Sequence, residues 1–81
     1  MYTIELKKAP NQDASDAEID FIFQDIANSI SEVQHVKSVK RDGNLLLVDA
    51  SSSVEDLKKA MKHIFSHHFD FVRLSHIEPV K

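Results

Sequence analysis

Two spacings of apolar residues, which take turns along the sequence, constrain the fold of this 81-residue chain more than any other feature. Tyr2, Ile4 and Leu6 recur at every second position, which is the period of a strand with one buried face. Residues 19–30 then carry apolar side chains three and four positions apart, the period of an amphipathic helix. Both periods return between residues 33 and 77. The pattern therefore predicts a chain of short strands separated by two helices.

Serine and acidic residues mark the start of both expected helices. Ser15 stands three residues before Glu18, and in such a capping box the serine accepts a hydrogen bond from an N–H of the first turn. We expect this first helix to end near Ser31. The second helix offers two alternative boxes of the same kind, Ser52 with Glu55 and Ser53 with Asp56.

The only glycine of the chain lies between two strand-like runs. Asp42-Gly43 is a strong hairpin signal because glycine tolerates a positive φ in a tight turn. The run after it, Leu45 to Ala50, is the third expected strand. The last strand carries four apolar residues and ends at a proline: Phe71, Val72, Leu74, Ile77 and Pro79.

The resulting order is strand, helix, strand, strand, helix, strand within a single domain of residues 1–81. This order is the ferredoxin-like βαββαβ arrangement, an α+β fold. Right-handed crossovers place both helices on one face of a four-stranded antiparallel sheet. The opposite side, called here the open sheet face, is then left without a covering layer.

Side-chain alternation predicts that apolar residues lie on the open sheet face. An apolar patch with a polar rim is typical of an association surface. In the alternative, long lysine and arginine side chains cover these residues. We expect a protein partner or a homodimer formed through sheet faces or edge strands. The residues assigned to the open face are Leu45, Leu47, Phe71 and, as a further candidate, Val39.

The first helix predicts a second candidate partner surface. Residues 9–36 contain six of the 13 acidic residues and none of the ten lysines and arginines. Acids in a first helical turn suit the helix dipole, and an acidic surface also attracts a basic partner. Phe21 points away from the apolar stripe, so it either tucks under the preceding loop or anchors a partner. The candidate surface comprises Asp20, Phe21 and Asp25.

His63 and His67 are candidate metal ligands because residues four apart share one face of a helix. No acidic residue stands at the spacing of a metalloprotease motif, and a third ligand is not evident. Histidines near a helix C-terminus also interact favourably with the helix dipole. We therefore expect neither a metal nor another cofactor, and keep the two histidines as candidates.

Residues 33–74 resemble the heavy-metal-associated domains, the small copper-chaperone family. The similar segments are residues 36–39, residues 42–48 across the hairpin, and residues 54–61 in the second helix. The family binds metal through a Met-x-Cys-x-x-Cys loop, whereas residues 8–13 read Lys-Ala-Pro-Asn-Gln-Asp and the chain has no cysteine. His35 stands where the family has a glycine. The resemblance implies the fold and, as an alternative function, metal sensing through histidine.

The βαββαβ order is also similar to that of the propeptides of subtilisin-type proteases. The last strand and tail of such a propeptide occupy the protease, and residues 72–78 correspond to that segment here. A likeness of topology does not establish function. A protease inhibitor or folding assistant is therefore a further alternative.

Composition argues against several functional classes. The chain has no cysteine, no glycine-rich phosphate loop and no serine in a nucleophile-like context, so we expect no enzyme. A net charge of −3 disfavours nucleic-acid binding. The longest apolar run, residues 45–48, is far shorter than the roughly 18 residues that a membrane span needs. The sequence predicts a cytosolic protein-interaction module that binds neither nucleic acid nor membrane.

Overall fold

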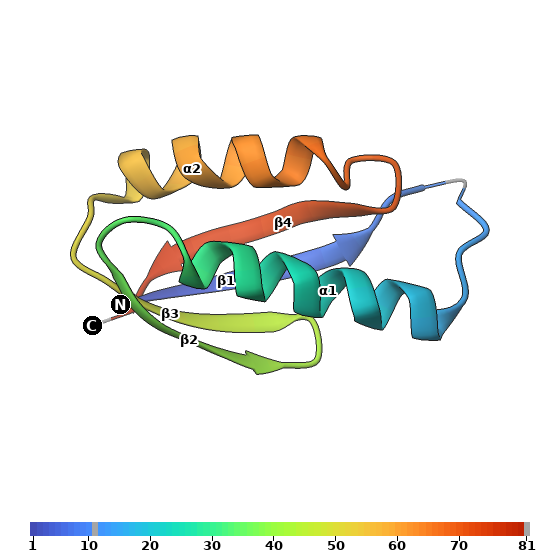
Figure 1. Cartoon of the computed structure of the whole chain (residues 1–81), viewed down its shortest axis with the longest axis horizontal. Coiled ribbons are helices and arrows are strands. Elements are labelled where there is room, and N and C mark those ends of the chain that lie inside the picture. The colour runs from blue at the N-terminus through green and yellow to red at the C-terminus, as the bar shows by residue number, and fades with distance from the viewer. Residues whose placement is uncertain (11, 81) are drawn as a thin grey trace.

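The computed structural model describes residues 1–10 and 12–80 and has the expected order of elements. Asn11, in the loop expected after the first strand, lies outside the described residues. The four strands form one antiparallel sheet in the order β2-β3-β1-β4, with both helices on one side of it (Figure 1). This confirms the ferredoxin-like α+β fold. The elements are β1 Tyr2–Lys8, α1 Asp16–Ser31, β2 Val36–Asp42, β3 Leu45–Ala50, α2 Val54–Ser66 and β4 Val72–Pro79.

Serine caps begin both helices, as the sequence predicts. Ser15 accepts a hydrogen bond from the backbone N–H of Glu18 at 3.2 Å, and its hydroxyl donates to the Glu18 carboxylate. Of the two boxes before α2, the structure uses the second, because Ser53 accepts from the backbone N–H of Asp56 at 3.2 Å. Each cap satisfies one of the N–H groups that have no partner inside the helix.

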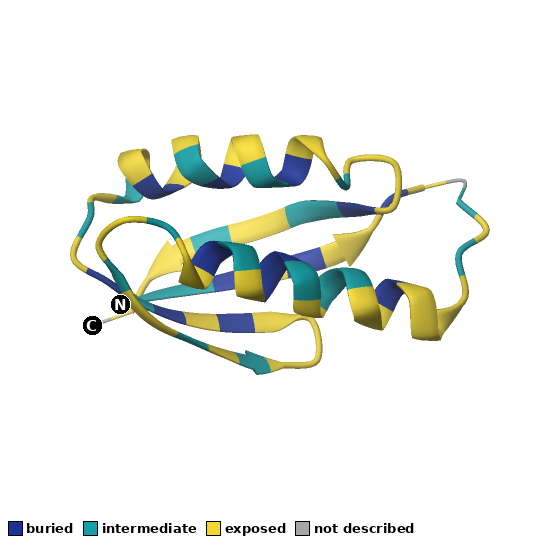
Figure 2. Cartoon of the chain, viewed as in Figure 1, coloured by how far each residue is buried: buried dark blue, intermediate teal, exposed yellow. Residues whose placement is uncertain are grey.

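One apolar core fills the space between the helices and the sheet. Figure 2 shows buried residues on the sides of these elements that face one another. No polar or charged residue among those the structure describes is buried, so the core contains hydrocarbon side chains and little else. Its members are Ile4, Leu6, Ile19, Ile26, Ala27, Ile30, Leu46, Val48, Ala50, Leu57, Met61, Phe65 and Val72.

A bulge in β2 overturns one assignment made from alternation. The register with β3 shifts between Val36 and Ser38, so Lys37 is an extra residue in the edge strand. The extra residue turns Val39 to the helix side, where it is half-buried against the core opposite Val48. Placing Val39 on the open sheet face was therefore wrong. Arg41, two residues further on, lies on the helix side as well.

The hairpin between β2 and β3 has a two-residue turn, Gly43 and Asn44. Gly43 has a φ of 60°, as the first residue of a type II′ turn requires. Among the described non-glycine residues only His35 has a positive φ, at 73°. His35 therefore has a left-handed backbone conformation, which favours glycine.

Two substitutions on α1 test this division between core and surface. Ile26 is fully buried, and its replacement by alanine leaves a cavity, so Ile26→Ala should lower the free energy of unfolding by about 2–5 kcal/mol. Phe21 is 73% exposed, and Phe21→Ala should change it by no more than about 0.5 kcal/mol. Chemical denaturation followed by circular dichroism measures both. A large loss of stability in Phe21→Ala would contradict the exposed position of this ring.

Candidate functional site

The open sheet face exposes two leucines from its second strand. Leu45 and Leu47 are 41% and 36% exposed. Leu46, which lies between them, and Val48, which follows them, point to the core. Long lysine and arginine side chains therefore do not cover the two leucines completely. This part of the prediction from alternation agrees with the structure.

Cross-strand pairing arranges the neighbours of these leucines in two rows. Residues directly opposite one another in an antiparallel sheet lie on the same face. Each row runs from β2 through β3 and β1 to β4, with a leucine in second place. The Lys40 row comprises Lys40, Leu47, Thr3 and Glu78, and the Asp42 row comprises Asp42, Leu45, Glu5 and His76. The leucines thus lie among charged and polar side chains.

Phe71 does not belong to the open sheet face, so that assignment was wrong. β4 begins at Val72, and the N–H groups of Phe71 and Val72 both donate to the His68 carbonyl, at 2.9 and 2.8 Å. The turn closed by these bonds redirects the chain before the strand starts, and strand alternation does not extend back to Phe71. The Phe71 carbonyl instead accepts from the Ala9 N–H at 2.9 Å.

Phe71 lies beside α1, where it joins Phe21. Both rings line a shallow cavity of about 420 Å³ together with Ile22, Ala17 and Glu18. Phe21 is 73% exposed, so it does not tuck under the loop after β1. The structure therefore brings together two of the predicted partner-binding aromatics, but on the helix side of the molecule. We call Phe21, Ile22 and Phe71 the phenylalanine patch.

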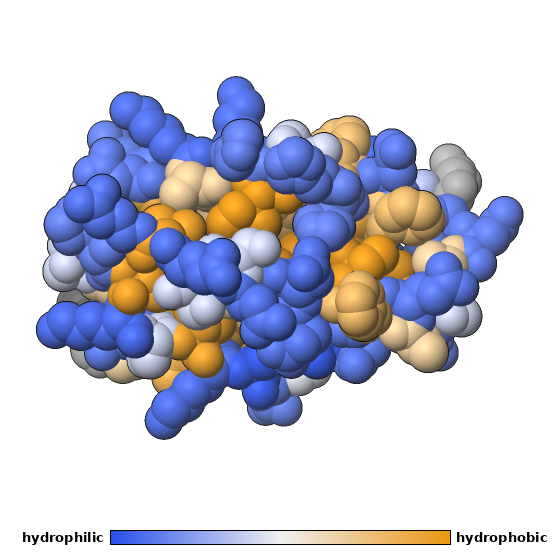
Figure 3. All heavy atoms as spheres, viewed as in Figure 1, coloured by the Kyte–Doolittle hydropathy of each residue, from blue (hydrophilic) through white to orange (hydrophobic). Residues whose placement is uncertain are grey.

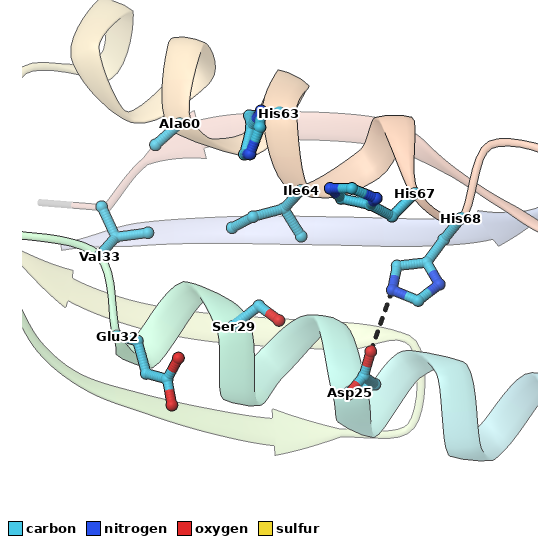
Figure 4. A pocket seen from close by; sticks show the side chains of 9 residues that line it. All are labelled: Asp25, Ser29, Glu32, Val33, Ala60, His63, Ile64, His67 and His68. Carbon is cyan, nitrogen blue, oxygen red and sulfur yellow. Dashed lines mark ion pairs between the residues drawn. The ribbon is translucent and has the colours of Figure 1, made fainter.

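Both predicted acidic contacts of α1 already have partners within the chain. Asp20 forms an ion pair with Arg41 of β2, whose side chain also donates to the Gly43 carbonyl at 2.9 Å. Asp25 Oδ2 lies 3.0 Å from His68 Nε2, beyond the end of α2 (Figure 4). These contacts link α1 to the sheet on one side and to α2 on the other. Asp20, Phe21 and Asp25 therefore do not form one unpaired acidic surface.

His63 and His67 face a groove of about 580 Å³ between the helices (Figure 4). Their ring centroids lie 5.4 Å apart in an edge-to-face arrangement, and Ser29 of α1 and Glu32, the residue after that helix, line the opposite wall. Figure 3 shows apolar atoms along the middle of this side of the molecule. Across residues 1–10 and 12–80, no three histidine or acidic side chains come close enough to hold one metal ion.

Comparison with known proteins identifies no relative of this chain. No protein-family model matches it, and no curated protein or solved structure is detectably similar to it. Within the described part of the chain, neither helix is long and apolar enough to cross a membrane.

Zinc titration tests the histidine pair. Structural and catalytic zinc sites use at least three protein ligands, whereas His63 and His67 supply two. We therefore expect isothermal titration calorimetry to show zinc affinity weaker than high micromolar, and His63→Ala to differ little from the unaltered chain. Tight binding that His63→Ala abolishes, and that the control His35→Ala preserves, would contradict this expectation.

Proposed function

We propose that this protein is a small, non-enzymatic binding module that self-associates as a homodimer through its open sheet face. The observation that carries the proposal is the complementarity of the Lys40 row and the Asp42 row. Position by position, the two rows oppose lysine to aspartate, leucine to leucine, threonine to glutamate, and glutamate to histidine. The last two, Glu78 and His76, already lie 3.2 Å apart within one copy, so the proposal depends on the first two positions. A surface whose two halves match in this way can bind a second copy of itself.

The symmetry of such a dimer follows from the rows. A twofold axis in the interface, perpendicular to the strands and midway between the rows, places the Lys40 row of one copy on the Asp42 row of the other. Lys40 then faces the second copy's Asp42, and Leu47 faces its Leu45. Every contact occurs twice, as in any isologous interface. Face-to-face sheets commonly pack in this aligned manner, about 10 Å apart.

The size of the apolar contact indicates a reversible dimer. Full burial of an exposed leucine stabilises by roughly 1.5–3 kcal/mol, and Leu45 and Leu47 are already more than half-buried in one copy. The charged ends of the rows contribute orientation and specificity more than affinity. These favourable contributions must offset the free-energy cost of the rotational and translational freedom lost on association. We infer a dissociation constant in the micromolar range.

The lack of enzymatic activity is part of the same proposal. Catalytic groups are commonly held in desolvated pockets that perturb their acidity. Over the described ranges 1–10 and 12–80 the core contains no polar residue, and each pocket lies at the surface. We also propose a cytosolic location, following the sequence-based expectation.

Metal sensing through histidine is a second candidate function. The observation that favours it is the pair His63 and His67, whose rings meet at the mouth of the groove between the helices. The zinc titration described above distinguishes it from the binding module. For the protease-inhibitor alternative, residues 72–80, the described part of this segment, offer no specific supporting contact.

A charge-reversal series tests the proposed dimer. Lys40→Glu and Asp42→Lys should each weaken self-association, because each places like charges opposite one another across the twofold axis. The double variant should restore it, because both pairs regain opposite charges. Sedimentation equilibrium measures the self-association of the three variants at protein concentrations from about 10 µM to 1 mM, a range chosen around the dissociation constant inferred above.

The matched control is Lys59→Glu, which makes the same charge reversal as Lys40→Glu but on the exposed side of α2, and it should leave association unchanged. A strictly monomeric protein at high micromolar concentration would contradict the proposal. Failure of the double variant to recover would contradict the proposed symmetry.

A further inference from the structure

A second groove lies on the other side of α2 from the groove between the helices. It has a volume of about 680 Å³ and runs between α2, the residues that follow it, and the first half of β4. Its apolar lining comes from Met61 and Phe65 of α2, Leu74 of β4, and Phe69. Phe69 is 55% exposed, so part of this apolar surface is in contact with solvent. The volume is within the roughly 300–1,000 Å³ of small-molecule sites.

Four cationic side chains line the same groove, and no acidic residue does. They come from three separate parts of the chain: Lys7 of β1, Lys58 and Lys62 of α2, and Arg73 of β4. Among the described residues, none of the four has a carboxylate partner within 4.0 Å, in contrast to Lys8 and Arg41. An apolar surface bordered by unpaired like charges attracts an anion.

Arg73 is oriented toward such an anion by contacts that do not neutralise it. Its guanidinium carbon lies 4.1 Å from the centre of the Phe69 ring, and its Nε donates to the Phe69 carbonyl at 3.4 Å. The two terminal amino groups have no acceptor among the described residues. A guanidinium held in this way can donate two parallel hydrogen bonds to a carboxylate or phosphate.

We propose that this groove binds a small amphiphilic anion, with one carboxylate or phosphate head and an apolar tail. The head pairs with Arg73 and the neighbouring lysines, and the tail lies on Phe69 and Leu74, the apolar lining residues that are not buried. A bare anion would leave the apolar lining in water, and a neutral amphiphile would leave the cations unpaired. A single molecule fits better than a membrane surface, because Met61 and Phe65 are 1% and 7% exposed and lie at the floor of the groove.

Decanoate and decyl phosphate, each below its micelle concentration, are suitable probes. We expect both to bind and to shift the amide resonances of residues 58–74 in two-dimensional NMR spectra of the intact chain. Decanol and decyltrimethylammonium should bind roughly tenfold more weakly, because they lose the charge-assisted contacts. Acetate and inorganic phosphate should show no saturable binding, because they lack a tail.

Two lysines of α2 provide a matched pair of variants. Lys62 lines the groove and Lys59 does not, although both are exposed on the same helix. Lys62→Gln and Arg73→Gln should each weaken decanoate binding by roughly tenfold, and Lys59→Gln by less than about twofold. The dispersion of each spectrum shows whether the variant is folded. Lys40→Glu should bind decanoate normally, so this test is independent of the proposed dimer.

Several results would overturn the proposal. Equal losses in Lys62→Gln and Lys59→Gln would indicate a general charge effect without a site. Binding to anionic phospholipid vesicles without binding to monomeric decanoate would assign the cations to a membrane surface. Tighter binding of a glutamate-rich octapeptide with one phenylalanine, with shifts of the same resonances, would assign the cations to a protein partner. No saturation by either probe at millimolar concentration would exclude the site.

Discussion

The structure depends on one contact layer, in which the apolar stripes of two helices pack against a single face of the sheet. A chain of this length buries only about 60% of its unfolded surface, so it has one core and no second layer. The five fully buried residues of the sheet lie on that face: Ile4, Leu6, Leu46, Val48 and Val72. The core excludes polar side chains over the described residues. Any apolar residue that the topology directs elsewhere remains exposed, and such residues belong to the surfaces for which we propose binding.

Those surfaces differ in chemistry. The open sheet face offers Leu45 and Leu47 within rows of charged and polar residues. The groove beside α2 combines Phe69 with cations that have no acidic partner in the described chain. The groove between the helices is different again, because acidic residues line it as well as histidines and one pair, Asp25 with His68, is already formed. Occupation of one surface therefore does not require occupation of another.

Local signals were sufficient to predict the elements, because caps, periods and turns depend on residues close in sequence. Examples are the cap at Ser15, the turn at Gly43 and the apolar stripe of α1. Val39 was misplaced because an extra residue, Lys37, interrupts the alternation of an edge strand. Phe71 was misplaced because backbone bonds to the His68 carbonyl turn the chain just before β4. Neither the bulge in β2 nor the turn before β4 has a sequence signal as strong as the Asp-Gly pair of the hairpin.

The candidate site was less accessible from the sequence than the fold. The exposed leucines followed from alternation, but their charged neighbours depend on the register of four strands. The basic groove was missed because Lys7, Lys58 and Arg73 are distant in sequence and meet only when β1, α2 and β4 are assembled. The pairing of Asp20 with Arg41 was likewise hidden, since Arg41 reaches α1 only because of the bulge.

The central claim, that the bare side of the sheet binds a second copy of itself, has a direct test in isotope-filtered NMR. A mixture of ¹³C-labelled and unlabelled protein at high micromolar concentration reports only contacts between different copies. We predict intermolecular nuclear Overhauser effects between the methyl groups of Leu47 and those of Leu45. Effects confined to the phenylalanine patch or to the edge strands, or none in a sample that sedimentation shows to be dimeric, would contradict the account.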